Sequence, residues 1–122
     1  MKHQPSEEML THIAARFRAL SDETRLRLLL ALQDGERSVG SLAEEVSVAQ
    51  ASVSKHLAVL KSAGLVSSRR EGPMALHHVR DDSIFQMCDI MCDGVRRLAA
   101  ETHSALGLGP RSRPRRQAAR TR

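Results

Sequence analysis

The chain has 122 residues, of which 41% are hydrophobic and only 2% aromatic, and its formal net charge is +5. This length provides one domain with a real core that needs neither disulfides nor metal. No run of about 18 apolar residues exists, which excludes a membrane span. Two cysteines and an N-terminus without an apolar signal segment predict a cytoplasmic protein.

The positive charge is concentrated at the C-terminus. Residues 107–122 contain six arginines and no acidic residue, and the rest of the chain has 13 basic against 14 acidic residues. A second, local basic stretch runs from residue 49 to residue 80, with five basic side chains and one acid. A local excess of positive charge on an otherwise nearly neutral domain is typical of a surface that binds phosphate groups.

Apolar spacing predicts a first helix from Ser6 to Leu20, with a break and a new helix cap at Ser21 and Asp22. The second helix is nearly apolar all round, with leucines from residue 26 to residue 32, and we expect it to be the central buried helix. Asp34 and Gly35 end it.

A short third helix is predicted to begin at Ser38 or Ser41, and a three-residue turn at 47–49 leads to a fourth helix over Gln50–Ser62. Two short helices joined by a tight turn form a helix-turn-helix unit. A strand over Leu65–Arg69, a turn over 70–73 and a strand over Met74–Val79 then form a β-hairpin, the wing.

Asp81, Asp82 and Ser83 can cap a long last helix that runs to about Ser104. Two apolar seams lie along this helix, and a small domain needs only one, so the second predicts a homodimer. A single wide stripe that faces the core is the alternative. The fold class is therefore mainly α with a β-hairpin wing, with about five helices. We expect a domain over residues 1–106 and a disordered basic tail over 107–122.

The fourth helix provides the candidate DNA-binding residues, because a recognition helix presents its N-terminal residues to base edges. Gln50 can bond adenine, and Lys55 supplies charge. Two adjacent arginines at the expected hairpin tip favour the approach of a phosphate backbone. The predicted double-stranded DNA contacts are Gln50, Ser52, Ser54, Lys55, His56, Lys61, Arg69 and Arg70.

The sequence resembles the ArsR/SmtB family of bacterial repressors. The resemblance rests on Phe17–Arg27, Ser52–Leu60, Ala63–Val66 and Arg69–Gly72, in that order. It implies a homodimer that represses a promoter and is released by an inducer. It also implies that the first and last helices form the dimer interface.

The inducer-binding residues of this family are largely missing. Arsenic-responsive members have two cysteines in the segment that reads Arg37–Leu42 here, and this segment contains none. Zinc-responsive members have four ligands along the last helix, where this chain offers Asp81 and Asp82, and then only His103. His77 and His78 point to opposite faces of a strand and cannot share a metal, and we expect one of them near DNA.

Cys88 and Cys92 remain as a tentative sensor. Their i, i+4 spacing puts both sulfurs on one helix face, and a two-fold dimer could bring four together. Thiolates suit thiophilic metals and metalloids, and a thiol pair can equally sense oxidants or persulfides. Two small core residues are the alternative, in which case the chain binds DNA without a small-molecule signal or a cofactor.

No nucleophile with a base, phosphate loop or pair of buried carboxylates is recognisable, so an enzyme is not expected. A metal-buffering protein needs more ligands than two cysteines. An architectural DNA-binding protein is a further alternative. Such a protein would protect DNA uniformly, whereas a repressor would protect a defined site with two-fold symmetry.

Overall fold

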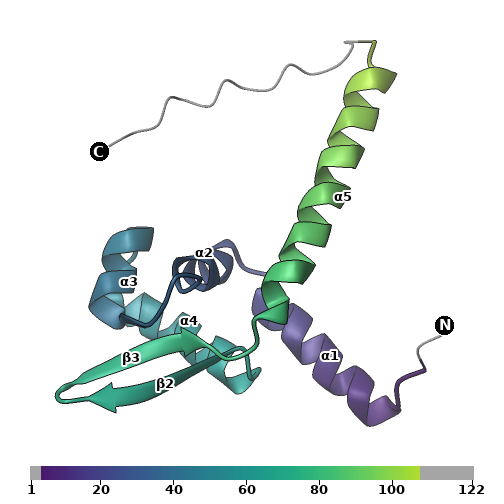
Figure 1. The fold of residues 1–122 in the computed structure, drawn as a ribbon. Coiled ribbons are helices and arrows are strands. Elements are labelled where there is room, and N and C mark those ends of the chain that lie inside the picture. The colour runs from purple at the N-terminus through teal and green to yellow at the C-terminus, as the bar shows by residue number, and fades with distance from the viewer. Residues whose placement is uncertain (1–3, 108–122) are drawn as a thin grey trace. The chain divides into compact units, whose positions relative to one another are not determined.

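The computed structural model describes residues 4–107, and within them it contains five helices and one three-stranded sheet (Figure 1). The chain divides into two compact units. The first extends to Asp82, and the second begins at Ser83 with the last helix. The predicted mainly α fold with a wing is confirmed. All of the predicted basic tail except Gly107 lies outside the described residues.

Each of the first two helices begins directly after a polar cap residue. Helix α1 spans Glu7–Leu20, and the Ser6 hydroxyl accepts a hydrogen bond from the Met9 N–H at 3.1 Å. Helix α2 spans Glu23–Ala31, with Asp22 accepting from the Arg25 N–H at 3.0 Å. The predicted break at Ser21 and Asp22 is thus confirmed, because each cap satisfies a backbone donor that the helix leaves free.

Helices α3 and α4 form the helix-turn-helix unit. Helix α3 spans Val39–Val46 and is capped by Ser38, and α4 spans Gln50–Ser62 as predicted. Between them, Ser47 has a left-handed backbone with φ of 56°. This conformation is costly for a residue other than glycine, and here it turns the chain sharply from one helix into the next.

The wing contains one strand more than the sequence indicates. Strand β1 is Arg37–Ser38, β2 is Val66–Glu71 and β3 is Met74–Val79, and they form an antiparallel sheet in the order β1-β3-β2. The predicted turn over 70–73 is too long. Glu71 pairs with Met74, so the hairpin turns at Gly72 and Pro73 alone.

The core of the first unit is aliphatic and lies between α2, α3, α4 and the base of the wing. Its fully buried side chains are Leu28, Leu29, Leu42, Val53, Leu60, Leu65 and Val66. Helix α2 contributes Leu28 and Leu29 to this core, as expected of a central buried helix, but Leu30 departs from that expectation because it is 52% exposed. Packing covers only one side of α2, and Leu30 lies on the other.

Helix α5 spans Ser83–Ala105, close to the predicted range. Its apolar residues beyond residue 89 are mostly exposed: Ile90, Met91, Val95 and Leu98. In the described part of the chain, no helix is both long enough and apolar enough to cross a membrane.

Candidate nucleic-acid interface

Helix α4 has one anchored face and one open face. Val53, Leu57 and Leu60 are buried and hold the helix on the first unit. Gln50, Ser54 and Lys55 are exposed, and Ser52 and His56 are half-buried beside them. The five residues predicted at the start of the recognition helix therefore lie on or next to its open face.

The N-terminus of α4 also has no side-chain cap. Its N-cap residue is Ala49, which accepts no hydrogen bond through its side chain. Alanine is a poor residue at this position, since the first backbone N–H groups of the helix then depend on other acceptors. These groups and the positive end of the helix dipole favour an anion such as a phosphate.

Lys61 lies at the other end of α4 and reaches the wing. Its ammonium group donates to the Ser68 hydroxyl of β2 at 2.8 Å. This bond connects the recognition helix to the sheet and uses one of the three donors of the lysine. The remaining donors of this exposed side chain are available to a phosphate.

Arg69 lies within β2, where it is bound by acids, and not at a hairpin tip as predicted. Its guanidinium donates to both carboxylate oxygens of Glu36, at 2.7 to 3.1 Å, and to Glu71 at 3.0 Å. The hydrogen bond from Arg69 holds the pKa of Glu36 below its ordinary value. Glu36 and Glu71 in turn raise the pKa of Arg69.

Arg70 is the freer of the two arginines. It also lies in β2, opposite Ala75 of β3, and within the described residues its side chain makes a single long hydrogen bond, of 3.4 Å to the Pro73 carbonyl. Its side chain is exposed beside the turn, where Gly72 has φ of +59°. Of the predicted pair, Arg70 is thus the arginine that is open to a ligand.

The two histidines of the wing occupy opposite faces of β3, as the alternation of strand residues predicts. His77 is buried, and neither of its ring nitrogens has a hydrogen-bond partner among residues 4–107. Burial, followed by the nearby charges of Lys61 and His78, lowers the pKa of His77. His78 Nδ1 lies 3.6 Å from Glu36 on the other face.

The structure adds Arg25 to the residues around α4. Arg25 lies on α2, and its guanidinium is 3.3 Å from Nδ1 of His56. Apolar periodicity could not identify this contact, because the two residues are 31 positions apart. The one sequence signal was the presence of Arg25 in the segment that resembles the repressor family.

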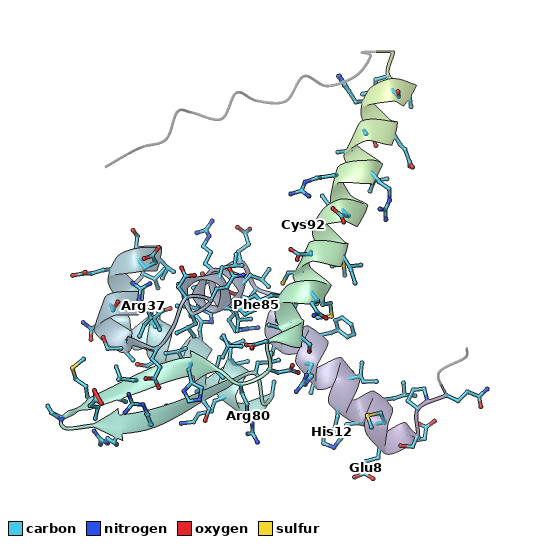
Figure 2. All side chains as sticks on the ribbon, in the orientation of Figure 1. Glu8, His12, Arg37, Arg80, Phe85 and Cys92 are labelled. Atoms are coloured by element: carbon cyan, nitrogen blue, oxygen red, sulfur yellow. The ribbon has the colours of Figure 1, made fainter. Side chains whose placement is uncertain are left out.

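The two cysteines are free thiols on α5, and Figure 2 labels Cys92 on this helix. Cys92 is exposed and Cys88 is half-buried, so neither is enclosed in an apolar core. Burial raises the pKa of Cys88, with smaller contributions from Cys92 and Asp89. Within residues 4–107, no three side chains of metal-binding type gather into a site.

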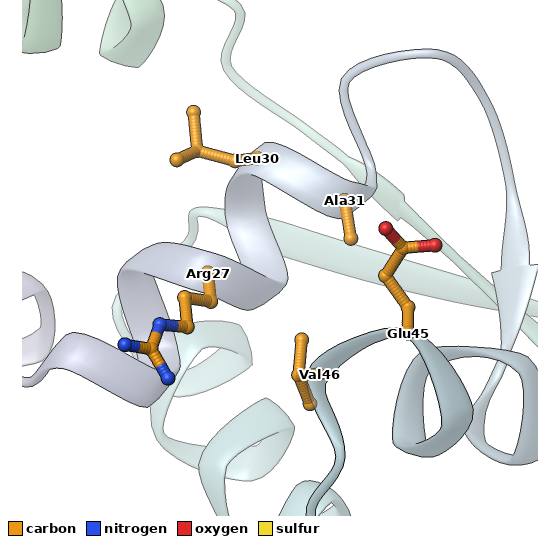
Figure 3. A pocket seen from close by; sticks show the side chains of 5 residues that line it. All are labelled: Arg27, Leu30, Ala31, Glu45 and Val46. Carbon is orange, nitrogen blue, oxygen red and sulfur yellow. The ribbon is translucent and has the colours of Figure 1, made fainter. Parts of the chain in front are cut away.

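A shallow groove of about 410 Å³ lies between α2 and α3 (Figure 3). Ala31 and Val46 point toward each other across it. Glu45 at its edge is bound by Arg37 at 3.2 Å. The groove is lined by Arg27, Leu30, Ala31, Glu45 and Val46.

Comparison with known proteins connects this arrangement to one family. Residues 22–68 match the family described as "Bacterial regulatory protein, arsR family". The chain is 38% identical to the "Probable mercury resistance operon repressor" of Streptomyces lividans, over 74% of this chain and 69% of that one. It is 42% identical to the transcriptional regulator KmtR of Mycobacterium tuberculosis, over 58% of this chain. That match spans 55% of KmtR, little more than half its length.

The fold is similar to a solved DNA-binding domain. The homodimeric winged helix-turn-helix domain Mb0332 from Mycobacterium bovis superposes with a TM-score of 0.67 and 30% identity. The match covers 76% of this chain and 91% of that one. The fold of this chain is thus a winged helix-turn-helix.

Proposed function

Because the chain belongs to the ArsR family of bacterial transcription regulators, we propose that it is a repressor that binds an inverted-repeat operator as a homodimer. Its class is a DNA-binding regulator and not an enzyme. We further propose that residues 1–106 make up the DNA-binding and dimerisation domain, and that 107–122 add charge to it.

The two-faced recognition helix is the observation that carries the DNA-binding proposal. Three buried apolar residues fix α4, while Gln50, Ser54 and Lys55 make no side-chain hydrogen bond or ion pair within the described chain. Polar groups that the protein leaves unpaired can bond base edges and phosphates without first losing an internal partner. Arg70 on the wing provides a second cation for the DNA backbone.

Exposed apolar residues on two helices support the homodimer. On α1 they include Ile13 and Phe17, the latter 50% exposed. On α5 they include Val95, which is 66% exposed. Such rows are typical of surfaces that a second chain covers, and the similar Mycobacterium bovis domain is homodimeric. Two copies related by a two-fold axis would place their recognition helices in successive major grooves, about one helical turn apart.

We propose that Cys88 and Cys92 receive the inducing signal, which is a thiophilic metal, a metalloid or a thiol-reactive compound. Cys92 is exposed and Cys88 is half-buried in the single chain, so neither fills a core of its own unit and both lie on the helix proposed to meet the second subunit. Two thiolates are too few for a closed metal site, and a dimer would supply four. A bond formed between the subunits would favour one dimer geometry, and release of DNA requires that this geometry bind DNA less well.

The decisive experiment combines footprinting with sedimentation. The wild-type chain is used to select duplexes from a random pool, and the protected site is mapped on the selected DNA. We expect a two-fold symmetric footprint and two chains per site. A monomer at micromolar concentration that binds one chain per site would contradict the proposal, and uniform coverage would indicate an architectural DNA binder.

A further inference from the structure

The guanidinium of Arg25 connects three helices of the first unit. Its Nε donates to the Ala19 carbonyl at 2.6 Å and its Nη2 to the Arg18 carbonyl at 3.1 Å, at the C-terminal end of α1. Its Nη1 lies 3.3 Å from Nδ1 of His56 on α4. The backbone N–H of Arg25 is bound to Asp22, so both ends of the residue are fixed.

The chemistry of the two side chains determines the direction of the bond to His56. A guanidinium has five N–H donors and no acceptor, so Nδ1 of His56 must be the acceptor. An imidazole that accepts at Nδ1 carries its proton on Nε2. The contact therefore selects both the ring orientation and the tautomer of His56.

We infer that Arg25 is a positioning residue that holds His56 with its Nε2–H directed away from α2, as a hydrogen-bond donor to DNA. The inference rests on the proposed DNA interface of α4. His56 is half-buried on the edge of the open face, next to the exposed Lys55. The acceptor on DNA is a phosphate oxygen or a base edge such as a purine N7, which offer the same chemistry to an N–H.

Positioning has a clear energetic benefit. An unconstrained neutral ring can rotate about the Cβ–Cγ bond, which exchanges the positions of Nδ1 and Cδ2 and of Nε2 and Cε1, and it can carry its proton on either nitrogen. Only one combination of rotamer and tautomer presents Nε2–H outward. Fixing that orientation before binding removes an ordering cost from complex formation. Arg25 can supply this constraint because its other two bonds are to backbone carbonyls, which themselves are held in α1.

The first test measures the free protein. Nitrogen NMR of the imidazole distinguishes a protonated from an unprotonated ring nitrogen. We expect Nδ1 of His56 to be unprotonated in the wild type, and its signal to change in Arg25→Met, which keeps the side-chain stem and removes every donor. An Nδ1–H tautomer in the wild type would overturn the inference, whatever the chain binds.

The second test measures DNA affinity in a double-mutant cycle. Gln places its amide nitrogen near the position of Nε2, and Asn places it near Nδ1. We expect His56→Asn to bind the selected duplex about tenfold more weakly than His56→Gln, the effect of one lost hydrogen bond. Arg25→Met should weaken binding in the wild type and have a smaller effect in the His56→Gln background.

The outcomes separate the possible failures. Equal effects of Arg25→Met in both backgrounds would mean that Arg25 only supports the fold, and would overturn the inference. If Arg25→Met does not fold, the comparison of the two His56 variants still decides the role of Nε2–H. Loss on selected and random duplexes alike assigns the acceptor to a phosphate, and loss on the selected duplex alone assigns it to a base. A wild-type chain with the expected tautomer but no affinity for DNA would overturn the proposed function itself.

Discussion

Arg69 and Glu36 form a two-bond ion pair between the wing and the residue before β1, with the shortest contact at 2.7 Å. The pair ties together segments that are 33 residues apart. The pair occupies a cation that the sequence predicts to contact DNA. The neighbouring Arg70 has no acidic partner among the described residues and makes only a long hydrogen bond to the Pro73 carbonyl.

The two arginines should therefore differ in a salt titration. We expect Arg70→Ala to reduce the slope of log affinity against log salt by about one unit, because one phosphate contact is lost. Arg69→Ala should change the slope less and lower the melting temperature of the free protein, since Glu36 and Glu71 lose their partner. Equal slope changes in the two variants would mean that Arg69 leaves Glu36 to contact DNA.

The same pair predicts a pH dependence of stability. The pKa of Glu36 is lowered in the folded state, chiefly by the hydrogen bond from Arg69. Its stabilisation is complete above the unfolded-state pKa of about 4.3 and is lost as the pH falls through the lower folded-state value. Glu36→Gln should therefore be less stable than the wild type at neutral pH, and the difference should shrink in acid.

Chemical denaturation between pH 7 and pH 3 measures this effect. Glu44→Gln, an exposed residue on α3, is the matched control. A difference between wild type and Glu36→Gln that stays constant across this range would rule out the ion pair as its source.

Gln50 should determine sequence preference more than general affinity. If its amide bonds one adenine at two positions, Gln50→Ala loses about 1–3 kcal/mol of discrimination at that base pair and little affinity for random DNA. Competition binding against single-substitution duplexes measures this loss. Gln33→Ala, an exposed glutamine before β1, is the control. An unchanged base preference would place the readout on other residues of α4.

The cysteines should be dispensable for DNA binding and required for release. We expect the variant with Cys88→Ser and Cys92→Ser to bind the selected duplex normally, because neither residue lies on α4 or the wing. Metals, oxidants and sulfide donors that release the wild type should not release it. Met91→Leu, a change of similar volume on the same helix, is the control. Retained induction in the double variant would move the search to the histidines.

The C-terminal arginines should add affinity without specificity. A chain truncated after Leu106 lacks six arginines. We expect weaker binding to random DNA at low salt and a shallower salt dependence, with the preference for the selected duplex unchanged. Filter binding at several salt concentrations tests this. Full low-salt affinity in the truncated chain would assign the segment another role.

Local features of this fold could be predicted from the sequence, and nonlocal ones could not. Ser6, Asp22 and Ser38 act on donors only three residues away, so a short sequence window contains the whole interaction. The approximate bounds predicted for helix α4 agree with the structure, because its buried positions recur at helical spacing.

Strand β1 is two residues long and exists only because β3 pairs with it, at a separation of 40 positions between Arg37 and His77. The contacts of Arg69 with Glu36 and of Arg25 with His56 are of the same kind. Periodicity contains no information on such partners. The sequence therefore predicted which residues of one helix and one hairpin make up the candidate site. It did not predict that Arg69 is paired with an acid while Arg70 is not.

The division of α4 into an anchored and an open face also bears on how new operator preferences arise. Substitutions at Gln50, Ser54 and Lys55 remove no packing and no internal bond, so their cost in folding free energy is small. Gene duplication followed by drift at these positions could redirect a copy to another promoter while its scaffold stays intact. The same three positions are the natural choice for a randomised library in which the chain is retargeted to a DNA sequence of choice.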